Sequence, residues 1–344
     1  MKLFSFFNQE LAIDLGTANT LIIQDGEVVV DEPSIVAVNR KSGEVIAVGH
    51  KAMQMHEKTH EDIKTIRPLK DGVIADFQAA EKMIEGMINM VGKRRRFFSH
   101  LKMVICIPSG ITEVEKRAVF DSADHVDSKE TYLIYEPMAA ALGIGLNVEE
   151  PIGNMIIDIG GGTTEIAVIA LSGIVCDQSI RTAGDEFTAD IVSYMKRQHN
   201  ILIGERTAEQ IKINVDSALP ELENPPADYP VNGRDLMTGI PKQITISYQE
   251  VAHSLDKSIS KVEDAILKAL ETTPPELASD IYKTGLYLTG GGALLKGLDK
   301  RVAAKTKLKV HIAEDPLRAV VRGTGIALSD IDRFMPILID RRSV

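Results

Sequence analysis

The chain has 344 residues, 44% of them hydrophobic, and a formal net charge of −10. This length is too great for one ordinary hydrophobic core, so we expect about two domains. The acidic balance argues against a general nucleic-acid binder, because neutralising phosphates needs clustered Lys and Arg.

Neither a secreted nor a membrane-spanning protein is expected. No window holds the ~18 uncharged apolar residues that a membrane span needs. The apolar N-terminal stretch ends at Phe7 without a small-residue cleavage site, which argues against a secretory signal. Cys106 and Cys176 lie in apolar runs, which predicts reduced core residues. These features predict a cytoplasmic protein of mixed α/β content.

Short β-rich runs separated by turn residues fill the first fifty residues. We predict five strands there, over residues 11–15, 20–24, 28–31, 34–39 and 44–48. Apolar residues at helical spacing then predict a helix over 78–91. A buried strand over 103–108 precedes a helix that opens with a capping box, Thr112 with Glu115.

Short β-rich runs separated by turn residues return from Asn154. We predict strands over 155–159, 165–171 and 286–289. Two further capping boxes, Thr207 with Gln210 and Ser247 with Glu250, predict helix starts, and four prolines between 220 and 230 predict a surface loop.

Two segments repeat each other. Asp14–Thr20 reads DLGTANT and Asp158–Thr164 reads DIGGGTT, with Asp, Gly and Thr at matching offsets. Each follows an apolar strand and leads into another strand. The match predicts an internal duplication, in which each half presents one glycine-rich hairpin.

Such hairpins suit a nucleoside triphosphate. Glycine lets backbone N–H groups approach phosphate oxygens without obstruction by a side chain. The preceding aspartates, Asp14 and Asp158, add hard oxygen ligands of the kind that Mg²⁺ prefers. One hairpin alone would be an ordinary turn, but two facing hairpins predict a clamp around a triphosphate.

A third glycine-rich segment, 288–298, reads LTGGGALLKGL. We predict a strand, three glycines and then a helix, whose N-terminal dipole would favour the ligand while the glycines admit a base and ribose. The segment is not a Walker loop, since its Lys lacks the flanking Gly and Ser or Thr. No segment matches G-x-G-x-x-G, which disfavours a dinucleotide site.

The order of these three motifs resembles the two phosphate motifs and the adenosine motif of the actin, Hsp70 and sugar-kinase superfamily. The wording of DLGTANT, YEPMAAALG, DIGGGTTEIAV and LTGGGALLKGL is similar to the MreB family of bacterial actin-like proteins, over Leu11 to about Leu328. Unlike actin and Hsp70, the first loop has no Lys after its glycine. Asn19 and Thr20 stand there instead, as in the MreB family.

The resemblance implies an actin-like, ribonuclease H-like duplicated fold with a nucleotide cleft between the halves and an inserted subdomain in each. The implied limits are 1–32, 66–145 and 314–344 for subdomain IA and 33–65 for IB. Subdomain IIA would span 146–181 and 244–313, and IIB 182–243.

The resemblance also implies a function. The protein would bind ATP and Mg²⁺, hydrolyse ATP slowly, and form filaments of itself on the inner face of the cytoplasmic membrane. There it would organise membrane-bound cell-wall elongation proteins and maintain rod shape, without binding nucleic acid.

The site residues that the resemblance implies come from all three motifs and from two helices. Thr163 and Glu136 would position the lytic water, and Asp14 and Asp158 would hold Mg²⁺, largely through water. The ATP contacts would be Gly16, Thr17, Ala18, Asn19, Gly160, Gly161, Gly162, Thr163, Gly184, Glu209, Lys212, Gly290, Gly291, Gly292 and Ala293. Without the resemblance, Glu209 with Lys212 would be interpreted as an exposed ion pair, and Glu136 as a helix-capping carboxylate.

His56–His60 reads HEKTH and fits the zinc-protease pattern H-E-x-x-H. The flanking charges indicate a solvated segment, whereas the zinc helix is normally packed in a core, and no third ligand follows. We therefore reject a zinc site.

Two apolar segments are predicted to contact a membrane. One is the N-terminal heptapeptide, with Met1, Leu3, Phe4, Phe6 and Phe7; the other joins Arg94–Arg96 to Phe97 and Phe98. Apolar side chains beside cations suit an anionic membrane surface. The alternative interpretation is that both segments pack into the hydrophobic core.

Three alternatives stay open at this point. A small-molecule kinase of the same superfamily would need an acidic base beside an acceptor pocket, and we find no such motif. An Hsp70-like chaperone would need a substrate domain after the nucleotide domain. The third alternative is FtsA or a plasmid-segregating actin. FtsA carries an amphipathic anchor at the C-terminus, where Arg341–Val344 offers none.

Overall fold

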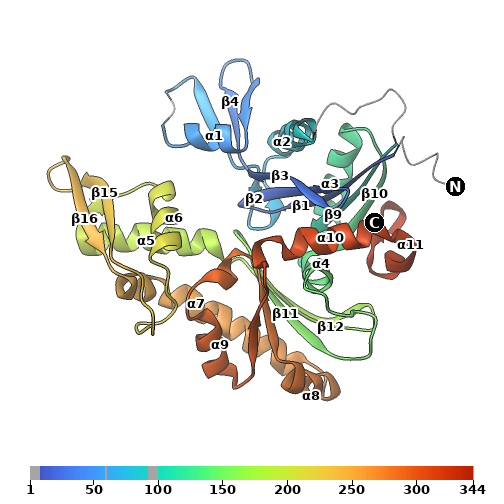
Figure 1. The fold of residues 1–344 in the computed structure, drawn as a ribbon. Helices are drawn as coiled ribbons and strands as arrows, with labels where there is room; N and C mark the ends of the chain where they lie inside the picture. The colour runs from blue at the N-terminus through green and yellow to red at the C-terminus, as the bar shows by residue number, and fades with distance from the viewer. Residues whose placement is uncertain (1–7, 59, 92–99, 344) are drawn as a thin grey trace.

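The computed structural model describes residues 8–58, 60–91 and 100–343. Its chain forms two halves, each built on one large β-sheet with helices on its faces (Figure 1). The predicted α/β class with two domains is confirmed. The predicted membrane contacts Met1, Leu3, Phe4, Phe6, Phe7, Phe97 and Phe98 lie outside the described residues. Among the described residues, no helix is long and apolar enough to cross a membrane.

We call the half with the six-stranded sheet domain I. The strand order is β19-β10-β9-β1-β2-β3. Its strands are β1 (Asn8–Leu15), β2 (Asn19–Gln24), β3 (Glu27–Pro33), β9 (His100–Ile107), β10 (Ser128–Tyr135) and β19 (Ile339–Asp340). Helices α2 (Phe77–Met90) and α3 (Glu113–His125) belong to the same half.

Domain II contains the five-stranded sheet, with the order β13-β12-β11-β17-β18. Its strands are β11 (Asn154–Ile159), β12 (Thr164–Ala170), β13 (Gly173–Ile180), β17 (Leu286–Thr289) and β18 (Val310–Ile312). Its helices include α7 (Tyr248–Thr272), α8 (Pro275–Thr284) and α9 (Leu298–Thr306).

The two sheets have the same topology. In each, an antiparallel hairpin (β1–β2 or β11–β12) extends to an antiparallel third strand. On its other side, the first hairpin strand pairs in parallel with one strand (β9 or β17), which pairs in parallel with the next (β10 or β18). Domain I adds the short antiparallel strand β19 beside β10. The predicted internal duplication is therefore confirmed.

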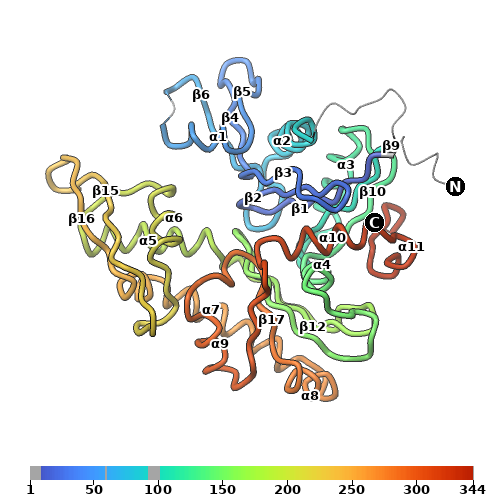
Figure 2. Tube along the Cα trace, viewed as in Figure 1, coloured from blue at the N-terminus to red at the C-terminus, as the bar shows by residue number. Residues whose placement is uncertain are grey.

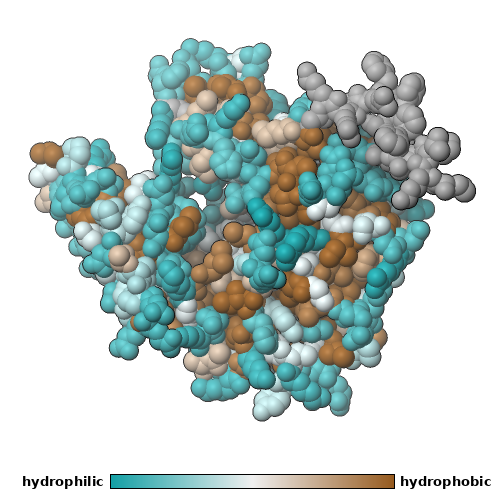
Figure 3. All heavy atoms as spheres, in the orientation of Figure 1, coloured by the Kyte–Doolittle hydropathy of each residue, from teal (hydrophilic) through white to brown (hydrophobic). Residues whose placement is uncertain are grey.

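Each half also carries a small lobe. The first lobe, on domain I, consists of β4 (Val36–Asn39), β5 (Val45–Val48), α1 (His50–Met55) and β6 (Ile63–Ile66). The second lobe, on domain II, consists of α5 (Gly184–His199), α6 (Glu205–Asn214), β14 (Ile201–Leu202), β15 (Tyr229–Asp235) and β16 (Pro241–Ile246). The molecular surface is hollowed between the two lobes (Figure 3). The limits predicted for the four subdomains stay predictions.

Most predicted elements lie where we expected them, with two differences. The capping boxes at Thr112 and Ser247 are confirmed, since each side-chain oxygen accepts from the backbone N–H three residues on. The capping box at Thr207 is wrong, because α6 already begins at Glu205 after Gly204. The third glycine motif leads into a short 3₁₀ turn, η2 (Gly291–Leu294), and α9 begins only at Leu298.

Two helices lie between the sheets and join the halves. Helices α4 (Glu136–Gly143) and α10 (Ala319–Ser329) pack in one apolar cluster with residues of β1, β9, β11 and β12 (Figure 2). Separate apolar clusters fill the rest of each half. The interface between the halves is thus a continuous core, while the lobes stand apart from it.

Helices α4 and α10 cross in backbone contact. A β-carbon built on Gly323 would lie 1.7 Å from the carbonyl oxygen of Ala139, and one on Gly143 would lie 1.8 Å from that of Ala319. Backbone atoms cannot yield as a side-chain tip does, so any larger residue forces the helices apart.

We expect Gly323→Ala to destabilise the protein by about 1–3 kcal/mol or more, because it overpacks the crossing. Gly325→Ala on the same helix is the matched control, since its β-carbon would lie 3.4 Å from Ile23 Cγ2, an ordinary contact. Alanine there improves helix propensity, so the control should be neutral or stabilising. Urea unfolding of both variants measures the difference, and equal stabilities would contradict the backbone contact.

Candidate nucleotide-binding site

The first glycine loop follows β1 and is tightly braced. Ser34 Oγ donates to the Gly16 carbonyl at 2.6 Å, and Ser34 N donates to the Ala18 carbonyl at 2.9 Å. At the end of β1, Asp14 Oδ1 accepts from the Cys106 thiol at 3.0 Å. Burial raises the pKa of Asp14 to about 6, although the thiol hydrogen bond opposes this shift.

The second loop repeats this arrangement after β11. Asp158 Oδ1 accepts from Thr289 Oγ1 at 2.8 Å, and Thr289 is the register partner of Asp158 on β17. Burial raises the pKa of Asp158 to about 7, the negative charges of Asp14 and Glu165 add to this shift, and the Thr289 hydrogen bond opposes it.

The two loops face one another closely. A β-carbon on Gly161 would lie 2.7 Å from Ala18 Cβ, and one on Gly162 would lie 2.6 Å from Thr17 Oγ1. Glycine is therefore required at both positions. The predicted phosphate residues of the two halves are thus brought together.

Glu136 and Thr163, the predicted catalytic pair, lie at this junction. Glu136 is the first residue of α4, directly after β10, and Thr163 is buried directly before β12. Burial raises the pKa of Glu136 well above its usual range, and the charges of Glu165, Asp158 and Asp14 raise it further. Glu136 therefore lies within the same electrostatic cluster as both aspartates.

Glu165 is a member of this cluster that the sequence interpretation missed. It is fully buried on β12 and accepts from Ser109 Oγ at 2.5 Å and Ser179 Oγ at 2.6 Å. Ser109 follows β9 of domain I and Ser179 lies on β13 of domain II, so one carboxylate bridges the halves. A charged residue in the otherwise uncharged strand TEIAVIA was the available signal.

A second missed element is the turn Asp71-Gly72 between β7 (Leu69–Lys70) and β8 (Val73–Ile74). Gly72 N donates to Thr17 Oγ1 at 3.1 Å, and a Gly72 β-carbon would lie 2.9 Å from Thr163 Cγ2. This turn therefore closes against both loops. An Asp-Gly pair between short β-rich runs is a hairpin signal that would have located it.

Gly184, Glu209 and Lys212 meet beside the second loop. Gly184 is the first residue of α5, and its N–H donates to the Gly160 carbonyl at 3.1 Å. Lys212 Nζ donates to the Gly184 carbonyl at 2.8 Å and pairs with Glu209 Oε2 at 2.6 Å. The Lys212 side chain is only 16% exposed, so this pair is not the freely exposed ion pair of the alternative interpretation.

The third glycine motif packs against the end of β11. Gly290 has φ +77°, and a β-carbon there would lie 2.4 Å from the Ile159 carbonyl oxygen. Gly291 is exposed, whereas Ala293 is fully buried. The expected helix dipole is wrong at this position, because α9 begins six residues beyond Gly292. Exposed backbone at Gly291 therefore stays available to a ligand, without a helix N-terminus behind it.

The acidic cluster fits a divalent cation. Asp14 and Asp158 are buried carboxylates whose pKa values are raised by burial, so a bound cation would favour their ionised forms. In the described part of the chain, no group of three or more His, Cys, Asp or Glu side chains is close enough to enclose a metal by itself. The arrangement therefore suits Mg²⁺ that retains waters and shares phosphate oxygens.

The H-E-x-x-H segment does not form a zinc-protease helix. Helix α1 ends at Met55, and Glu57 has φ +60°, outside the helical region. His56 instead makes a hydrogen bond through Nδ1 with Thr65 Oγ1 at 2.9 Å.

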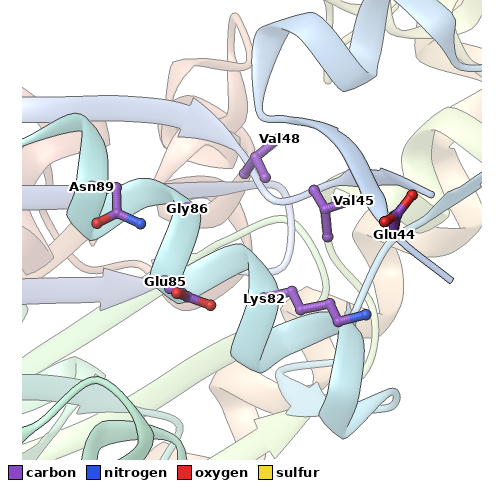
Figure 4. Close-up of a pocket in the computed structure, with 7 residues that line it drawn as sticks. All are labelled: Glu44, Val45, Val48, Lys82, Glu85, Gly86 and Asn89. Atoms are coloured by element: carbon purple, nitrogen blue, oxygen red, sulfur yellow. The ribbon is translucent and has the colours of Figure 1, made fainter. Parts of the chain in front are cut away.

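A shallow pocket lies elsewhere, between β5 and α2 (Figure 4). Gly86 on α2 packs closely against Val48 there, since a β-carbon on Gly86 would lie 2.8 Å from Val48 Cγ2. Its lining residues include none of the predicted nucleotide contacts.

Comparison with known proteins places this chain in a family. Residues 8–335 match the model of the MreB/Mbl protein family. The chain is 45% identical over 329 residues to the cell shape-determining protein Mbl of Bacillus subtilis (strain 168), covering 95% of this chain and 98% of that one. It is 46% identical over 336 residues to the cell shape-determining protein MreB of Escherichia coli (strain K12), covering 96% of each.

A solved structure agrees with these relatives. The crystal structure of MreB5 of Spiroplasma citri bound to AMPPNP superposes with a TM-score of 0.90 at 39% identity, covering 95% of this chain and 98% of that one. The predicted actin-like fold is thereby confirmed. The chain belongs to the MreB/Mbl family.

Proposed function

We propose that this protein binds ATP with Mg²⁺ between its two glycine loops and hydrolyses it slowly while assembling into membrane-attached filaments that maintain cell shape. The observation that carries the proposal is the pair of facing loops, each ending a strand at a buried aspartate, Asp14 or Asp158. Support comes from the relative crystallised with AMPPNP and from relatives named as cell shape-determining proteins.

Binding would use backbone groups more than side chains. The N–H groups of Thr17–Asn19 and Gly160–Gly162 would cradle the terminal phosphates from the two halves. Glu209 and Lys212 on α6 would contact the ribose and base, and the backbone at Gly290–Ala293 would lie over the adenosine. Mg²⁺, held by Asp14 and Asp158 largely through water, would neutralise phosphate charge when bound.

Hydrolysis would depend on positioning a water molecule. Glu136 and Thr163 lie at the junction of the loops, where a carboxylate and a hydroxyl can orient water toward the terminal phosphate. Burial raises the pKa of Glu136, so its carboxylate would accept a proton from that water more readily than an ordinary carboxylate would.

Assembly and attachment extend the proposal beyond the cleft. Nucleotide would favour the closed, polymerising arrangement of the halves through differential affinity. The apolar segments with Met1, Leu3, Phe4, Phe6 and Phe7, and with Phe97 and Phe98, would attach the filament to the inner face of the cytoplasmic membrane. There it would organise membrane-bound cell-wall elongation proteins.

We expect Glu136→Ala to lower phosphate release by about 10²–10⁴-fold and to leave ATP affinity within a few-fold, because Glu136 is assigned to water rather than nucleotide. Glu130→Ala, at an exposed site on β10 with a weak surface pair to Lys102, is the matched control. Phosphate release and equilibrium titration measure the two effects. Loss of both together in Glu136→Ala would reduce Glu136 to a structural role.

We expect Asp158→Asn to weaken Mg²⁺-dependent ATP binding about tenfold or more, equivalent to ~1.4 kcal/mol, since it removes a charge from the cation site. Its amide oxygen can still accept from Thr289. Asp332→Asn, an exposed carboxylate on α11 (Ile331–Phe334), should leave binding unchanged. Calorimetric titration of each variant with ATP, with and without Mg²⁺, measures this effect. If Asp158→Asn bound ATP with Mg²⁺ as tightly as the unchanged protein, Asp158 would not belong to the cation site.

The same variant should change the pH dependence of stability. In the nucleotide-free protein, Asp158 has a pKa of about 7, against about 4 in an unfolded chain. The folded state therefore binds more protons between these values, so the free energy of unfolding falls as pH rises through that window. Asp158→Asn should reduce this slope by up to about 1.4 kcal/mol per pH unit in urea unfolding.

We expect ATP to produce sedimentable polymer on anionic liposomes without any acceptor sugar, which a small-molecule kinase would not do. One apolar segment binds lipid weakly, but a filament presents many, so polymer should float and monomer should not. Deleting Met1–Phe7 together with Phe97→Ser and Phe98→Ser should abolish flotation while leaving polymer intact. Undiminished flotation of that variant would contradict the membrane assignment.

A further inference from the structure

A contact crosses the hollow between the two lobes. Glu57, in the segment that links α1 to β6 of domain I, accepts a hydrogen bond through Oε1 from the backbone N–H of Glu205 at 3.1 Å. Glu205 is the first residue of α6 in domain II. The hydrophilic surfaces of the lobes approach one another at this side of the hollow (Figure 3).

Helix α6 lacks a cap of its own. Its N-cap residue is Gly204, which has no side chain to accept from the N–H groups of the first turn. Glu57 supplies the missing acceptor from the opposite domain, and its negative charge suits the positive end of the helix. Gly204 is what admits it, because a β-carbon there would lie 2.3 Å from Glu57 Oε2.

The Glu57 contact is part of a polar seam. His56 Nε2 lies 3.7 Å from Glu205 Oε2, and Arg67 Nη2 lies 3.9 Å from the same oxygen. Arg67 Nη1 also lies 3.9 Å from Asp185 Oδ1 on α5. These distances exceed normal hydrogen bonds, and in the described chain His56 Nε2 and Arg67 Nε are buried without a hydrogen-bond partner. Apart from the Glu57–Glu205 hydrogen bond, the contacts of this seam are therefore loose.

Glu57 itself is constrained. Its φ of +60° is uncommon for a residue with a β-carbon, and such a conformation persists only where surrounding contacts determine it. The preceding residue is anchored by the His56–Thr65 hydrogen bond at 2.9 Å. The first lobe thus holds an exposed carboxylate in a fixed direction, toward α6.

Helix α6 also carries the proposed nucleotide contacts. Glu209 and Lys212 lie on it, and Lys212 connects to the Gly184 carbonyl at 2.8 Å. Gly184 in turn donates to Gly160 of the second phosphate loop. A short chain of contacts therefore runs from Glu57 to the proposed site.

We propose that Glu57 is a positioning residue that caps α6 from across the cleft and thereby slows the release of bound adenine nucleotide. The contact must break before the lobes part, so it adds to the barrier for opening. This inference rests on the proposed function, because it requires nucleotide in the cleft.

Four variants separate the cross-cleft contact from the stability of α6. Glu57→Ala removes the cap, and Glu57→Gln keeps an oxygen that can accept from Glu205. Gly204→Ser gives α6 a cap within its own domain while its β-carbon displaces the Glu57 carboxylate, and its backbone, at φ −83° and ψ 167°, suits an N-cap serine. Glu61→Ala, at an exposed position in the same segment, is the control.

The measurement is the dissociation rate of a fluorescent ADP analogue by stopped flow, at protein concentrations below assembly, with thermal unfolding recorded alongside. We expect Glu57→Ala and Gly204→Ser to release the analogue about fivefold faster, equivalent to ~1 kcal/mol. Gly204→Ser should unfold at the same or a higher temperature, Glu57→Gln should retain most of the slow release, and Glu61→Ala should match the unchanged protein.

Unchanged release in both Glu57→Ala and Gly204→Ser would overturn the proposal. So would fast release in Glu57→Ala combined with normal release in Gly204→Ser, since Glu57 would then act only on helix stability. Hydrogen exchange of the nucleotide-free protein distinguishes this failure from failure of the proposed function. If the analogue does not bind at all, the proposed function fails, while protection of the Glu205 amide that is lost in Glu57→Ala would still establish the contact.

Discussion

The cost of burying several carboxylates close together is the constraint on which this structure depends. Asp14, Asp158, Glu136 and Glu165 converge where the two halves meet, and burial raises the pKa of each. A protein without a ligand there carries the cost of desolvating these groups or of protonating them. A bound cation would relieve that cost. The site itself would then contribute binding energy, beyond the contacts that a nucleotide would make.

The rest of the fold holds this unfavourable cluster in place. Helices α4 and α10 cross in backbone contact between the sheets, and the large apolar clusters continue on both sides of them. Overpacked or loosened helices would change the distance between Glu136 at the start of α4 and Asp158 on β11. The lobes, by contrast, meet through an exposed carboxylate and long ion pairs. The tightest packing therefore lies beside the candidate site and the loosest contacts lie between the lobes, a distribution that would suit the exchange of a ligand.

Sequence patterns predicted the parts of the site that depend on local geometry. Asp14 and Asp158 end apolar strands before glycine loops, and strand, loop and duplication follow from that pattern alone. The cap of α6 could not be predicted in this way. Gly204 looks like a plain break before Thr207, a better capping residue by propensity, and its true acceptor is Glu57, nearly 150 residues earlier in the chain. Contacts between distant segments produce no periodic pattern in the sequence. For the same reason, the hydrogen bonds from Ser109 and Ser179 to Glu165 could not be predicted from the sequence.

The duplication also shows how two equivalent halves acquired different chemistry. Register pairing places Cys106 beside Asp14 and Thr289 beside Asp158, each on the neighbouring parallel strand. Each donates to the aspartate next to it, so this feature is common to both halves.

Across the hairpin, however, Asp14 is the partner of Leu21, whereas Asp158 is the partner of Glu165. The extra negative charge raises the pKa of Asp158 further, and it also acts on Glu136. One difference between equivalent strand positions thus gives only the second half an additional buried carboxylate beside its aspartate. Burial raises the pKa of both aspartates, and for Asp158 the charges of Asp14 and Glu165 add to this shift.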